Sequence, residues 1–93
     1  MNDEELPEYN PRARAALLQG LEDQLRSPET PEVKAELKRL VSVGISKRKA
    51  KEMMAFVLAV HIARMMKNQS SFDYSAYVEE LRRLPEVDED QPL

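Results

Sequence analysis

The chain has 93 residues, a length that supports one small domain with a single hydrophobic core. Its residues are 42% hydrophobic and 33% charged, which is typical of a folded soluble domain. The absence of cysteine and the presence of one histidine exclude a disulfide scaffold, a thiolate zinc site and a multi-histidine metal site within the chain. With 2 glycines and no tryptophan, neither a glycine-rich phosphate loop nor aromatic platforms for nucleic-acid bases are expected.

The charges are unevenly distributed along the chain. The formal net charge is −3, but residues 1–9 and 86–93 each carry four acidic residues and no basic one. The 14 basic residues all lie between these segments, together with 9 acidic ones, so the middle carries +5. We predict one helical domain over 10–85 between acidic flexible tails at 1–9 and 86–93. The tails serve solubility or fold back over the basic middle.

The first helix is predicted to begin at Asn10-Pro11, a favoured cap followed by a favoured first residue. Its apolar stripe consists of Leu17, Leu18, Leu21 and Leu25. The prolines of Ser27-Pro28-Glu29-Thr30-Pro31 end this helix, and Thr30 is a candidate cap for a second one. The second helix presents Val33, Leu37, Leu40 and Val41 on one face. Gly44 is suited to the left-handed conformation that stops a helix.

A long third helix is predicted from Lys47 to about Asn68, with Ser46 as its cap. Between Met53 and Met66 it is apolar nearly all round, apart from His61 and Arg64. This run is shorter than the roughly 20 residues of a membrane span, so a buried central helix is the better interpretation.

A fourth helix is predicted after the cap residue Asp73 and before Pro85. Its apolar face comprises Tyr74, Tyr77, Val78, Leu81 and Leu84. The fold class is therefore all-α, a compact four-helix bundle-like domain around a long central third helix. The core is expected to bury Phe56, Val57, Leu58 and Ile62 against Leu17, Leu21, Leu37, Leu40, Tyr77 and Leu81.

The order of these signals resembles that of a group of small bacterial all-helical proteins described only as a domain of unknown function. The resemblance covers residues 10–85 and rests on Asn10-Pro11-Arg12, Pro31-Glu32-Val33, Gly44-Ile45-Ser46, His61-Ile62, Phe72-Asp73-Tyr74 and Leu84-Pro85. It implies a helical fold and no agreed activity. These motifs are caps, turns and core positions, so they specify fold better than function.

A basic cluster surrounds the start of the third helix: Lys38, Arg39, Lys47, Arg48, Lys49 and Lys51. Cations in the first turns of a helix oppose its dipole, so the cluster is either a solvated, partly paired face or a contact surface. As a contact surface, Lys47, Arg48, Lys49 and Lys51 would bind an anion or nucleic acid. The helix–Gly–helix pattern at Gly44 also resembles a helix-turn-helix, but the third helix is too apolar to lie exposed in a groove.

His61, Arg64 and Asn68 share a face of the third helix. They form either a narrow polar stripe at solvent or a polar network at a subunit contact. The helical methionines Met53, Met54, Met65 and Met66 fill the core or line a hydrophobic seam. The candidate association surface consists of Val57, His61, Arg64, Met65 and Met66.

No nucleophile–base pair and no set of metal ligands can be assembled, so no enzyme activity, cofactor or metal is predicted. We predict a cytoplasmic, non-catalytic protein that acts through protein association, as a homodimer or with another partner. The alternative is a nucleic-acid-associated regulator that uses the basic cluster. No membrane partner is expected.

Overall fold

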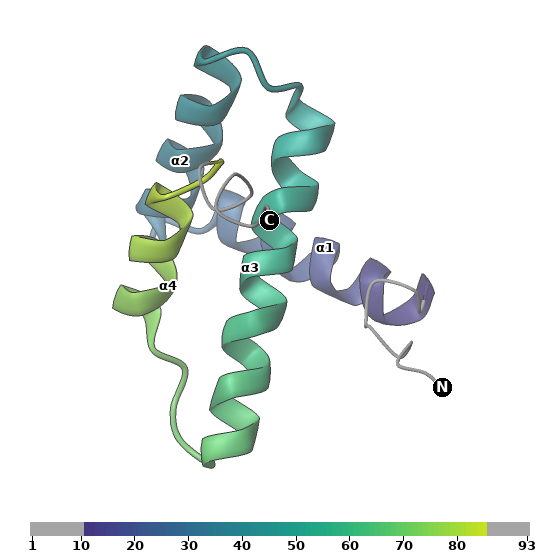
Figure 1. Cartoon of the computed structure of the whole chain (residues 1–93), viewed down its shortest axis with the longest axis vertical. Helices are drawn as coiled ribbons and strands as arrows, with labels where there is room; N and C mark the ends of the chain where they lie inside the picture. The colour runs from purple at the N-terminus through teal and green to yellow at the C-terminus, as the bar shows by residue number, and fades with distance from the viewer. Residues whose placement is uncertain (1–10, 86–93) are drawn as a thin grey trace, which may run out of the picture.

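The computed structural model describes residues 11–85. They form four helices and no strand (Figure 1). The helices are α1 (Pro11–Arg26), α2 (Pro31–Ser42), α3 (Lys47–Asn68) and α4 (Tyr74–Arg82). This confirms the all-α class and the long third helix. The expected cap at Asn10 and both acidic tails lie outside the described residues.

Two of the predicted caps position their helices as the sequence indicates. The hydroxyl of Ser46 accepts a hydrogen bond from the Lys49 amide at 3.1 Å, at the start of α3. The carboxylate of Asp73 accepts from the Ala76 amide at 3.1 Å, at the start of α4. Each side chain satisfies an amide that has no partner within its own helix, so both boundaries follow from local sequence.

Thr30 precedes α2 as predicted, but its side chain makes no capping hydrogen bond. The Val33 amide, a usual capping donor, bonds to the Thr30 carbonyl at 3.2 Å instead. The Thr30 hydroxyl donates to the Gln24 carbonyl in the last turn of α1, at 2.8 Å. Carbonyls in a last helical turn lack intrahelical partners, so Thr30 completes the end of α1 rather than the start of α2.

The end of α2 is a Schellman motif centred on Gly44, which has φ of +102°. The Gly44 amide bonds to the Val41 carbonyl at 3.0 Å, and the Ile45 amide to the Leu40 carbonyl at 3.1 Å. This confirms the left-handed stop expected at Gly44. α3 ends similarly at Gln69, a non-glycine residue with φ of 52°.

α3 is the central helix and contacts each of the other three. The buried hydrophobic core is formed by Leu21, Val33, Leu37, Leu40, Ala50, Met54, Ala55, Val57, Leu58, Tyr77, Leu81 and Leu84, and Val78 is buried as well. Leu17 and Ile62 are half-buried and pack against this core. α3 therefore serves as the hydrophobic centre of the domain, as the apolar run in the sequence indicates.

Phe56 was predicted to be buried, and this prediction is wrong because its side chain is 57% exposed. Its neighbours Val57 and Leu58 are each only 4% exposed. Residues two apart on a helix point to nearly opposite sides, so α3 cannot bury Leu58 and Phe56 against the same neighbours. In Figure 1, α3 crosses in front of α1, and no described helix lies in front of α3.

Candidate interaction surface

The side of α3 that no other described helix covers carries an apolar stripe, here called the outer face: Met53, Phe56, Val60, Ala63 and Met66. Phe56 and Met66 are 57% and 68% exposed. Ala63 is also exposed, whereas Met53 and Val60 are half-buried. The residues follow one another at intervals of three or four, so they lie along one side of the helix. Met53 also packs against the core, so the exposed part of the stripe is Phe56, Ala63 and Met66, and a partly exposed apolar stripe of this kind is a feature of partner sites.

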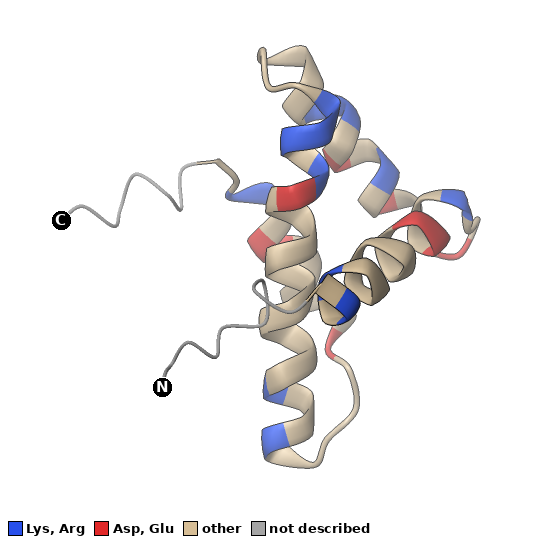
Figure 2. Ribbon diagram, turned by 90° about the vertical axis from the view of Figure 1, so that its right-hand side faces the viewer, with Lys and Arg blue, Asp and Glu red and all other residues tan. Residues whose placement is uncertain are grey.

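Basic side chains border the outer face at both ends. Lys49 lies one turn before Met53, and Arg64 and Lys67 lie near Met66; all three are exposed. Among the described residues, none of these three side chains is in an ion pair. In Figure 2, α3 has blue segments near both of its ends, and a long tan stretch follows the red segment that lies next to the upper blue ones. Within residues 11–85, the face thus offers apolar surface between positive charges that form no ion pair.

The one carboxylate of α3 does not neutralise these cations. Glu52 bonds to Arg14 of α1 at 2.8 Å and lies 3.6 Å from Arg48, one turn earlier on α3. Glu52 is therefore shared between two other cations at the edge of the face.

The predicted association surface is divided by the fold. Arg64 and Met66 are exposed and Met65 is half-buried. Val57 and His61 are only 4% and 5% exposed, because other helices of the same chain cover them. Those two residues therefore contribute to the core, and the exposed stripe lies on the other side of α3.

His61 is held by α4. Its Nε2 lies 2.8 Å from Oε1 of Glu80, and its ring packs edge-on against Tyr77 and Phe72, with centroids 5.9 Å and 6.5 Å away. The idea that His61 belongs to a solvent-facing stripe with Arg64 is thus wrong. Sequence analysis missed the partner because Glu80 is 19 residues away and approaches only when α4 docks.

The basic cluster is only partly available for binding. Lys51 forms an ion pair with Glu22 of α1, and Arg48 pairs with Glu52. Lys47, Lys49 and Lys38 are exposed. A shallow cleft of about 560 Å³ lies between α1 and the start of α3. It is lined by Arg14, Leu18, Glu22, Lys47, Arg48, Lys51 and Glu52. Because carboxylates and cations alternate there, the cleft is not a uniformly positive site.

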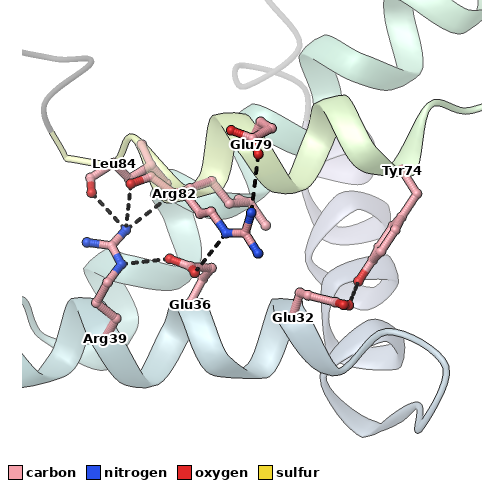
Figure 3. A network of polar contacts seen from close by, with 8 residues as sticks. Glu32, Glu36, Arg39, Tyr74, Glu79, Arg82 and Leu84 are labelled. Atoms are coloured by element: carbon pink, nitrogen blue, oxygen red, sulfur yellow. Dashed lines mark hydrogen bonds and ion pairs between the residues drawn. The ribbon is translucent and has the colours of Figure 1, made fainter.

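Arg39 has a structural role (Figure 3). Its guanidinium donates to the carbonyls of Leu81 and Leu84 at 3.2 Å and 2.9 Å, and to the Arg82 carbonyl at 3.3 Å. It also pairs with Glu36 at 2.7 Å. Carbonyls at a helix end lack intrahelical partners and attract cations, so Arg39 of α2 caps the end of α4. It is therefore not free to join a contact surface.

Two tyrosines attach α4 to the first two helices. The Tyr74 hydroxyl donates to Glu32 of α2, and the Tyr77 hydroxyl donates to Gln24 of α1, each at 2.6 Å. Burial, followed by the hydrogen bond to Glu32, raises the pKa of Tyr74 to about 12. Burial also raises the pKa of Tyr77, and the Tyr74 hydrogen bond lowers the pKa of Glu32. The two tyrosines and their partners therefore stabilise the packing of α4 and do not form a reactive site.

Within residues 11–85, no group of three or more histidine and carboxylate side chains is placed to hold a metal ion. The same part of the chain contains no helix with the length and apolarity to cross a membrane.

Comparison with known proteins found no matching family model, no matching curated protein and no matching solved structure. The resemblance to a small bacterial helical family therefore remains a prediction.

The outer face has a signal in the sequence that was not singled out. From Lys49 through Met53, Phe56, Val60 and Ala63 to Lys67, the residues follow one another at steps of four, three, four, three and four. This is the spacing of a helix–helix seam. The signal is ambiguous because the opposite side of α3 is also apolar. Only the position of the other helices distinguishes the buried side from the exposed one.

Proposed function

We propose that this protein is a non-catalytic helical module that acts by binding another protein chain through the outer face of α3. The observation that carries the proposal is the aromatic ring of Phe56, which is 57% exposed and belongs to the apolar stripe of the outer face. Full burial of such a side chain is worth about 1.5–3 kcal/mol, and the part of the ring that is still exposed accounts for about half of this free energy. A partner that covers the stripe would gain that part of the free energy.

The nucleic-acid alternative has weaker support. Of the four residues expected to contact phosphate, Arg48 and Lys51 are already paired with carboxylates of the chain. Lys47 and Lys49 remain, and two phosphate contacts give only weak, strongly salt-dependent binding.

Site-specific photo-crosslinking in the cells that produce the protein tests the proposal. A photoreactive phenylalanine replaces Phe56, and the matched control places it at Ala35, which is exposed on α2. We expect a discrete cross-linked species from position 56 and none from position 35. Mass spectrometry of the species distinguishes another protein from a second copy of the chain. Absence of an adduct at position 56, or equal adducts at both positions, would overturn the assignment of this face.

A further inference from the structure

Resting on the proposed function, a more specific inference concerns the chemistry of the partner. We propose that the outer face of α3 binds an acidic amphipathic helix of another protein. The spacing of the apolar residues and the positive charges at the two ends of the face both favour such a partner, and a second copy of the chain matches them less well.

The spacing of the stripe fits the packing of a second helix against α3. Met53, Phe56, Val60 and Ala63 alternate steps of three and four, which is the pattern along which two helices pack at a shallow angle. The small side chain of Ala63 permits close approach of a second helix. α3 itself is fully helical from Lys47 to Asn68, so the seam is continuous.

The charges specify an acidic partner. Lys49 and Lys67 lie 18 residues apart on α3, or about 27 Å along the helix, and enclose the apolar stripe. Neither they nor Arg64 has a carboxylate partner among the described side chains. A helix with apolar residues on one face and Asp or Glu near both ends would match apolar surface to apolar surface and neutralise all three cations.

A second copy of the chain fits the same face less well. In an antiparallel pair that matches the stripe to itself, with Phe56 of one copy beside Ala63 of the other, the one carboxylate that α3 offers is Glu52, which already bonds to Arg14 of its own chain. In a parallel, in-register pair, each lysine would lie beside its own equivalent. The parallel arrangement places like charges at each end of the seam, which is unfavourable at helix–helix contacts, and in the antiparallel one α3 supplies no free carboxylate to the three cations. Charge therefore favours a different, acidic chain.

Two synthetic helical peptides test the inference with the full-length protein. Both carry leucines at the spacing of the stripe; one has glutamates at the remaining flanking positions, and the other has lysines. In fluorescence anisotropy at low salt, we expect the dissociation constant of the acidic peptide to be at least about tenfold lower than that of the basic peptide. The difference between the two should shrink as salt is added.

Three variants locate the binding. Phe56→Ser should abolish binding of the acidic peptide; the change is compatible with folding because the ring is exposed. The double variant Lys49→Glu/Lys67→Glu should reverse the preference toward the basic peptide. Lys34→Glu reverses a charge that is also exposed, on α2, and should leave the preference unchanged.

Several results would overturn the inference. These are equal binding of the two peptides, binding of neither, or a preference that survives the double charge reversal. If the chain dimerised at higher protein concentration and the acidic peptide were displaced as it did so, the face would be assigned to a second copy. If the peptide bound only after the acidic residues of 1–9 and 86–93 were changed to amides, the chain's own segments would be the occupant. A position-56 cross-link without acidic preference would reject only this inference, whereas no cross-link would reject the proposed function as well.

Discussion

The two glycines of this chain meet opposite conformational demands. Gly44 has φ of +102°, a region that side chains rarely adopt, and it closes α2. Gly20 lies inside α1, where a β-carbon would meet the Leu58 side chain at 3.8 Å, an ordinary contact distance. A close helix approach is therefore not the reason for glycine at position 20. Glycine is merely tolerated at position 20, whereas the positive φ at position 44 requires it.

Substitution of each glycine by alanine should change stability in opposite directions. Gly20→Ala should raise the free energy of unfolding by about 0.5–1 kcal/mol, because alanine is the better helix former and its methyl group has room. Gly44→Ala should lower it by about 1 kcal/mol, because alanine resists the left-handed conformation. Urea unfolding measures both. Destabilisation by Gly20→Ala would mean that α1 and α3 approach more closely than described.

At the scale of the element, α3 has two apolar sides with different roles. One side carries Leu58 and Val57, which hold the fold together, and the other carries Phe56, which other helices do not cover. Uniform apolarity in a helix usually indicates enclosure by neighbours. Here α1, α2 and α4 are shorter than α3, and together they leave its outer face open.

Alanine substitutions on the two sides of α3 should separate stability from binding. Leu58→Ala should reduce the free energy of unfolding by about 2–5 kcal/mol, because it leaves a cavity in the core. Phe56→Ala should reduce it by less than about 1 kcal/mol, because much of the ring is already in water. Chemical denaturation of both variants gives the comparison. A loss below about 1 kcal/mol for Leu58→Ala would refute the central position of α3.

At the scale of the whole molecule, polar contacts between distant segments fix α4. Tyr77 reaches Gln24 in α1, Tyr74 reaches Glu32 in α2, and Glu80 holds His61 in α3. α4 therefore has a polar anchor on each of the other helices, in addition to its apolar face. These anchors make the stability of the domain sensitive to the ionisation of the tyrosines.

Alkaline pH should destabilise the protein through Tyr74 and Tyr77. The pKa of Tyr74 is raised to about 12 in the folded chain from its ordinary value of 10.0, and that of Tyr77 is raised also. Above about pH 10 the unfolded chain releases tyrosine protons that the folded chain retains, so stability is complete below pH 10 and falls as pH rises toward 12. Thermal melts across this range should show the fall.

The variant Tyr77→Phe provides the control for that experiment. It should be less stable than the parent near neutral pH, because the hydrogen bond to Gln24 is lost, yet its stability should decline less steeply above about pH 10. An unchanged slope in the variant would show that other groups, such as lysines, cause the alkaline loss.

The sequence by itself determined the helices and their limits. Ser46, Asp73, Gly44 and the prolines act on amides and dihedral angles within a few residues of themselves, so their effects can be derived locally. The apolar run of α3 likewise identified the central helix. These features depend on covalent geometry and short-range hydrogen bonding, which neighbouring residues in the chain specify.

Only the tertiary structure decided which apolar side of α3 is buried and which cations are free. Phe56 and Leu58 are equally hydrophobic candidates in the sequence, and their difference arises from where α1, α2 and α4 pack. Arg39, Lys51 and His61 find their acidic or carbonyl partners 19 to 45 residues away along the chain, apart from the local pair of Arg39 with Glu36. Such contacts depend on the relative placement of whole helices, a property that local spacing does not encode.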